Sequence, residues 1–311
     1  MARSDDHPHN GLGATAVTAA ATVGVALVGL GGIGWAAMSG QARDAARRIE
    51  DAAIDAAVAS GAIPPGRTLA AGDIRPPDGD GLYPPARTAM PRAENPGPAP
   101  AGDATAGLTL TMLGDSTSVG FGTDRADQLP GVLLARRLAT EFAVPVRLST
   151  HGRVGAASAE LADQVTAALA ERPDLAVIVI GANDITERVP PGRAARLLGA
   201  AVAGLRAERV QVVVATCPDF GVIAPIPQPL RTLVTRWSQR LAALQDRAVR
   251  AADGVPIAIG RLVSPEFRGR PDLFYADGFH PSASGYARAV DVMTPEVIEA
   301  ARRALDARAT G

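Results

Sequence analysis

Hydrophobic positions divide the chain into three parts, and the first is a long uncharged run. Residues 11–41 carry no charged side chain, and Ala14–Met38 is longer than the about 20 apolar residues that cross a bilayer core. This run predicts a transmembrane or signal-anchor helix within residues 1–40. A cleavable signal peptide is the nearest alternative, but only Arg3 precedes the run, against two aspartates, which favours an uncleaved anchor.

The same run contains Gly29, Gly31 and Gly34 in the spacing of a dinucleotide-binding loop. Such a loop follows a strand, and a second strand with a terminal acidic residue comes about 20 positions later. Here an alanine-rich helical stretch follows instead. The motif therefore gives no reason to expect a nucleotide cofactor.

Residues 41–107 form the second part. Apolar residues recur at helical spacing across residues 42–60, which predicts an amphipathic helix. Residues 61–107 contain ten prolines, and such a stretch is typical of a semi-rigid tether. Its segment "DGDGLYPP" differs from the rest of the tether, because Leu82 and Tyr83 are apolar side chains that can pack on the core of the following domain.

The third part, residues 108–311, alternates strand and helix patterns. Five apolar β-rich runs appear: "LTLTML", "VRLST", "LAVIVIG", "VQVVVATC" and "PIAIGRL". Helical patterns occur at about 131–142, 157–171, 192–207, 229–252 and 282–304. This alternation predicts an α/β domain in which helices cover both faces of a five-stranded parallel sheet. The ligand site of such a sheet lies beyond the carboxyl ends of the strands.

Composition narrows the possible partners. The formal net charge of −1 gives no reason to expect nucleic acid, and all 31 basic residues are arginine. The single cysteine, Cys217, excludes an internal disulfide and a cysteine zinc cluster, and its position indicates a small buried residue. The four histidines are too scattered to suggest a metal site.

Residues with groups that can take part in catalysis follow four of the predicted strands. Ser116 comes after the first strand, Gly152 and Gly155 after the second, and Asn183 after the third. Asp277 and His280 come after the fifth. Each of them alone is ordinary turn or helix-cap chemistry. Together they provide a nucleophile, two oxyanion donors and a carboxylate–imidazole pair, which are the parts that acyl transfer needs.

The blocks "GDS", "GRVGA", "GAND" and "DGFHP" resemble, in this order, blocks I, II, III and V of the SGNH (GDSL) hydrolase superfamily. The resemblance covers residues 108 to about 295 and is closest to an esterase branch from actinobacteria. It implies a flavodoxin-like three-layer α/β/α sandwich and no metal or organic cofactor. It also implies that Ser116 is the nucleophile, that Asp277 orients the base His280, and that the oxyanion donors are Gly155, Asn183 and the Ser116 N–H.

The function expected from the sequence is a membrane-anchored serine esterase that acts on a small ester. No long insertion in the domain suggests a lid, which favours short acyl groups. An acyltransferase with the same machinery is the near alternative, and a non-catalytic envelope binding module is the alternative from another class. The oligomeric state is left open.

The side of the membrane is predicted from two opposing signals. Arg43, Arg47 and Arg48 follow the anchor, and only one arginine precedes it, which favours a cytoplasmic domain. The resemblance to exported esterases and the long tether favour the cell envelope. We expect the catalytic domain on the extracytoplasmic side.

Overall fold

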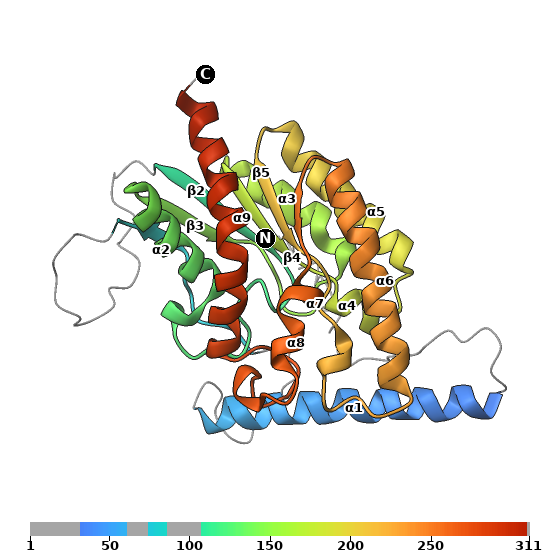
Figure 1. The fold of residues 1–311 in the computed structure, drawn as a ribbon. Coiled ribbons are helices and arrows are strands. Elements are labelled where there is room, and N and C mark those ends of the chain that lie inside the picture. The colour runs from blue at the N-terminus through green and yellow to red at the C-terminus, as the bar shows by residue number, and fades with distance from the viewer. Residues whose placement is uncertain (1–31, 61–73, 86–106, 310–311) are drawn as a thin grey trace, which may run out of the picture.

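The computed structural model describes residues 32–60, 74–85 and 107–309. The chain there forms a mixed six-stranded sheet in the order β1-β3-β2-β4-β5-β6, with helices on both faces (Figure 1). The strands are β1 Gly81–Tyr83, β2 Leu108–Gly114, β3 Val146–Thr150, β4 Leu175–Val179, β5 Gln211–Ala215 and β6 Val255–Ile257. The helices are α1 Gly32–Ala59, α2 Pro130–Phe142, α3 Leu161–Ala170, α4 Ala182–Thr186, α5 Pro191–Ala207, α6 Leu230–Ala251, α7 Ile259–Leu262, α8 Ser264–Phe267 and α9 Ala283–Ala309.

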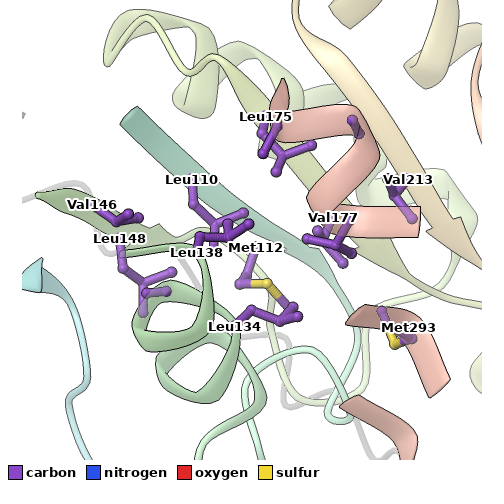
Figure 2. Close-up of a cluster of buried hydrophobic side chains, with 14 of the residues drawn as sticks. Leu110, Met112, Leu134, Leu138, Val146, Leu148, Leu175, Val177, Val213 and Met293 are labelled. Atoms are coloured by element: carbon purple, nitrogen blue, oxygen red, sulfur yellow. The ribbon is translucent and has the colours of Figure 1, made fainter. Parts of the chain in front are cut away.

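The central strands are buried on both faces, as their continuous apolar sequence predicts. Leu110 and Met112 of β2 point toward α2 and α9, where they meet Leu134 and Met293 (Figure 2). Their neighbour Leu113 points to the opposite face, into the cluster under α3 and α5. This alternation is the period-two geometry of a strand, and it gives a three-layer sandwich with a core on each side of the sheet.

The sheet has six strands, so the prediction of five is wrong. The additional strand β1 lies in the proline-rich segment and pairs antiparallel with the edge strand β3. Prolines flank β1 on both sides, and proline is tolerated only at the edge of a sheet. A strand of three residues shows no readable alternation, and its partner lies more than 60 residues away, so its sequence did not reveal it.

Tyr83→Ala should lower the free energy of unfolding by about 3 kcal/mol. Tyr83 is 2% exposed, packs in the core beside α2, and donates a hydrogen bond from its hydroxyl to the Gly79 carbonyl. Urea denaturation measures the change, and Tyr83→Phe, which keeps the ring, should cost only about 1 kcal/mol. An unchanged midpoint for the alanine variant would show that β1 adds nothing to the fold.

The helix predicted at 42–60 is confirmed as the larger part of α1, which begins ten residues earlier. Most of the predicted membrane segment, residues 14–31, lies outside the described residues. In the described ranges, no helix has the length and apolar character that a membrane crossing requires.

Candidate active site

The candidate residues gather at the carboxyl ends of β2 and β4, in the middle of the sheet. The five parallel strands have the order β3-β2-β4-β5-β6, which is the flavodoxin-like order. The chain passes from β2 to β3 on one side and later crosses to β4 on the other, so the order reverses between β2 and β4. Ligands of open α/β sheets bind at this switch point. Ser116 and Asn183 follow the two strands that flank it.

The turn that carries Ser116 is held by its neighbours. Gly114 has φ +127°, and a Cβ there would lie 1.8 Å from the Val179 carbonyl oxygen, so only glycine fits. The Gln164 amide accepts a hydrogen bond from the Gly114 N–H at 2.7 Å and donates one to the Gly114 carbonyl at 3.0 Å. The Asp115 carboxylate accepts from the Thr117 N–H at 2.9 Å. These contacts fix the backbone on both sides of the serine.

Ser116, His280 and Asp277 form one hydrogen-bonded chain. His280 Nε2 lies 2.9 Å from Ser116 Oγ, and His280 Nδ1 lies 2.6 Å from Asp277 Oδ2. Because the carboxylate can only accept, Nδ1 carries the proton and Nε2 is free to accept from the serine hydroxyl. Asp277 is 2% exposed, and its other oxygen accepts the N–H groups of Phe279 and His280. The arrangement is that of a nucleophile, a base and a group that orients the base.

Two aromatic rings hold the imidazole from the sides. The ring centroids of Phe121 and Phe279 lie 4.4 and 5.0 Å from that of His280. Phe121 is fully buried, and its carbonyl accepts a hydrogen bond from the Tyr286 hydroxyl at 2.8 Å. The ring of His280 is therefore positioned by packing as well as by its hydrogen bonds.

Backbone and amide donors lie beside the serine. Gly155 has φ +82°, and its N–H has no acceptor among the described residues; the same is true of the Ser116 N–H. Asn183 Nδ2 donates to the Ala156 carbonyl at 2.9 Å, which uses one of its two N–H bonds and leaves the other available. Three donors of this kind can stabilise an oxyanion. Their role remains a prediction.

Comparison with known proteins decides the family. Residues 112–288 match the GDSL-like Lipase/Acylhydrolase family. The chain belongs to this family. The SGNH (GDSL) resemblance read from the four blocks is thereby confirmed.

Individual relatives of this GDSL-family chain agree with the assignment. A GDSL-like esterase of Mycobacterium tuberculosis is 47% identical over 200 residues, which are 63% of this chain and 64% of that protein. The chain thus spans less than two thirds of that relative's length. Among solved structures, TesA matches with 24% identity and a TM-score of 0.51, over 62% of this chain and 99% of its own. Phospholipase A1 from Streptomyces albidoflavus matches with 16% identity and a TM-score of 0.51, over 61% and 99%. Likeness at these identities establishes the fold alone.

The sequence did not reveal the side chains that support the site. Asp184 is fully buried and accepts hydrogen bonds from the Ser158 N–H at 3.1 Å and hydroxyl at 2.6 Å. This pair joins the loop after Gly155 to the start of α4, which carries Asn183. Gln164 and Asp184 lie far along the chain from the groups they bind, so only the folded structure brings the partners together.

Cys217 takes no part in the candidate chemistry. It is buried at the end of β5, and burial raises the pKa of its thiol well above the usual value. Its thiol therefore stays protonated, and the prediction of a small buried residue is confirmed.

Asn183→Ala should lower kcat by roughly 10²–10³-fold with little change in KM, because an oxyanion donor acts mainly in the transition state. Steady-state kinetics on a soluble ester measures this. Loss of the bond to the Ala156 carbonyl should also cost about 1 kcal/mol of stability. A variant that melts earlier but keeps its kcat would reduce Asn183 to a structural role.

Asp115→Asn should change how stability depends on pH. Burial raises the pKa of Asp115 from 3.8 to about 6 in the folded chain. The folded state therefore binds the proton more tightly than the unfolded state. The contribution of this group to stability is complete below about pH 4 and is lost as the pH rises through about 6, by about 3 kcal/mol. The asparagine variant should gain stability relative to the parent over this window.

Urea midpoints of both proteins between pH 4 and 7.5 test this, since subtracting the two curves removes the contribution of every other acid. Asp55→Asn is the matched control, because Asp55 lies on the exposed face of α1. Parallel curves for Asp115→Asn and its parent would contradict the prediction.

Proposed function

We propose that this chain is a serine esterase that hydrolyses small carboxylic esters through an acyl-enzyme. The observation that carries the proposal is the continuous chain from Ser116 Oγ through His280 to Asp277. Ser116 Oγ attacks the ester carbonyl while His280 Nε2 takes the hydroxyl proton. Asp277 keeps the imidazole in the required tautomer and stabilises the imidazolium.

The negative charge that develops on the carbonyl oxygen would be met by the N–H groups of Ser116 and Gly155 and by the Asn183 amide. When the tetrahedral intermediate collapses, His280 returns its proton to the departing alcohol. Water then attacks the acyl-serine with His280 again as base, and the acid leaves. No metal or organic cofactor has a part in this sequence of steps.

A short acyl chain is the proposed substrate group. An apolar pocket of about 100 Å³ adjoins the catalytic histidine, with Phe220, Ile223 and Phe279 in its wall. Its volume is well below the about 300–1,000 Å³ of pockets that hold drug-sized ligands, which favours a chain of few carbons. The name GDSL-like esterase of the Mycobacterium relative supports an ester as the substrate.

We further propose that residues 14–38 anchor the protein and that the hydrolase domain faces the extracytoplasmic side. The uncharged run in the sequence and the long segment before β2 support this. External protease applied to intact spheroplasts should cleave the domain at the same dose that cleaves a known envelope protein. Survival of the domain would place it in the cytoplasm.

Hydrolysis of p-nitrophenyl esters with two to twelve acyl carbons tests the activity and the chain-length preference. We expect the highest kcat/KM for the esters with the fewest acyl carbons. A quenched reaction should contain acyl-enzyme, whose ester bond to serine is cleaved by alkali. Faster ester consumption on addition of a long-chain alcohol, with a new ester as product, would identify the acyltransferase alternative. Failure to hydrolyse any of the esters and to react with a fluorophosphonate would leave only the binding module.

A further inference from the structure

Helix α1 lies across the carboxyl ends of the sheet's parallel strands, where the candidate catalytic residues lie (Figure 1). Near its start, Ala42 packs in one cluster with Ala182 and Cys217, which follow β4 and β5. Eleven residues later, Ala53 packs in another cluster with Phe121, which follows β2. A helix advances about 16 Å over that interval, which carries α1 across the middle of the sheet edge.

The middle of α1 passes close to the turn that holds the catalytic carboxylate. The Arg48 side chain donates a hydrogen bond to the Pro225 carbonyl at 3.2 Å. Pro225 in turn lies against Gly278, since a Cβ on that glycine would be 3.0 Å from the proline ring. Gly278 directly follows Asp277. Phe121, the partner of Ala53, is also the ring that packs on His280.

The site beneath α1 is nearly closed. Ser116 is 5% exposed, and the side chain of His280 is 14% exposed. An ester carbonyl must approach the serine oxygen to about 3–3.5 Å before it can react. The alcohol portion of an ester needs still more room. Helix α1 reaches this closed site through the groups around it, because Ala53 packs with Phe121 and Arg48 binds Pro225 beside Gly278.

The contact that α1 makes is one that can open. From Ala42 onward its buried positions are alanines, which remove little apolar area from water, and the larger Ile49 and Ile54 are only partly buried. Met38, at 6% exposed, is the larger side chain that α1 buries. The Gln41 side chain donates a hydrogen bond to the Gln228 carbonyl at 3.1 Å, and water can replace this exposed bond when α1 moves. The two large clusters on the faces of the sheet contain no residue of α1. The helix can thus leave without exposing either of the main cores.

We propose that α1 is a movable lid that covers Ser116 and determines how large an ester reaches it. This proposal rests on the serine esterase function proposed above. In the closed position only small esters enter; a bulky ester reacts in proportion to the fraction of molecules in which α1 has moved away. The lid comes from outside the α/β domain, which is why the domain sequence showed no insertion for it.

Ala53→Arg in the full chain tests the lid, because it places a guanidinium where the parent is 1% exposed. The rate of Ser116 labelling by a fluorophosphonate–rhodamine probe should rise by at least about tenfold. The kcat/KM for p-nitrophenyl acetate, a small ester, should rise less. Arg48→Ala, which removes a bond at the surface and leaves the core intact, should shift both rates in the same direction by a smaller factor.

Ala59→Arg is the matched control, since it makes the same change at an exposed position of α1. Its labelling rate should equal that of the parent. Equal acceleration of labelling in both arginine variants would overturn the lid proposal, and so would no acceleration in either Ala53→Arg or Arg48→Ala. In both cases, labelling of the parent would still support the serine esterase proposal. A parent that neither labels nor hydrolyses any ester would overturn both proposals.

Discussion

Ser116→Ala should reduce ester hydrolysis by on the order of 10⁶-fold and abolish labelling by fluorophosphonates, with the fold intact. The substitution removes only one oxygen, the atom that lies 2.9 Å from His280 Nε2. The backbone of the turn is held by Gln164 and Asp115, and these contacts do not involve the serine hydroxyl. The loss should therefore appear in kcat and not in the melting temperature.

Ser118→Ala is the matched control for this experiment. It removes a buried hydroxyl two residues further on, whose hydrogen bond goes to the Asp115 carbonyl at 2.7 Å. That variant should lose stability only, so it should still be labelled at Ser116. An Ser116→Ala protein that retains full esterase activity would end the whole hydrolase interpretation.

Much of the fold could be predicted because its central strands are buried on both faces. A run such as Leu175–Val179 must be apolar throughout, and the turn residues that follow it are then easy to locate. The same logic led to Ser116, Asn183 and His280 as candidates, since each stands directly after a predicted strand or next to a predicted helix. The local sequence was enough to predict a strand, and the residues after it, wherever the apolar run and its turn lie within one segment.

The rest depends on contacts between segments that are distant in the sequence. Strand β1 exists because β3 offers an open edge, and no local pattern encodes that pairing. Gln164 and Asp184 look like ordinary polar helix residues until the fold brings Gly114 and Ser158 to them. The sequence predicts that α1 is amphipathic. It does not predict that the alanines of α1 pack at the carboxyl ends of the strands, where the candidate catalytic residues lie.

His280→Ala should reduce kcat nearly as much as loss of the serine, by on the order of 10⁶-fold, because a serine hydroxyl is a poor nucleophile without an adjacent base. The double variant Ser116→Ala/His280→Ala should be no slower than the worse single variant, since the two groups act in one step and their losses do not add. Steady-state kinetics with p-nitrophenyl acetate at several pH values measures each of them.

The chain offers His151 as the matched control, the other histidine among the described residues. It follows β3, and its Nε2 lies 3.4 Å from a carboxylate oxygen of Glu171. His151→Ala should leave kcat within a few fold of the parent, because the described residues show Ser116 Oγ hydrogen-bonded to His280 and not to His151. If both histidine variants lost activity equally, the damage would come from loop structure, and the assignment of His280 as the base would fail. If only His280→Ala loses it while its melting temperature holds, the loss belongs to the proton transfer, and the 2.6 Å contact to Asp277 explains why the imidazole is ready to accept it.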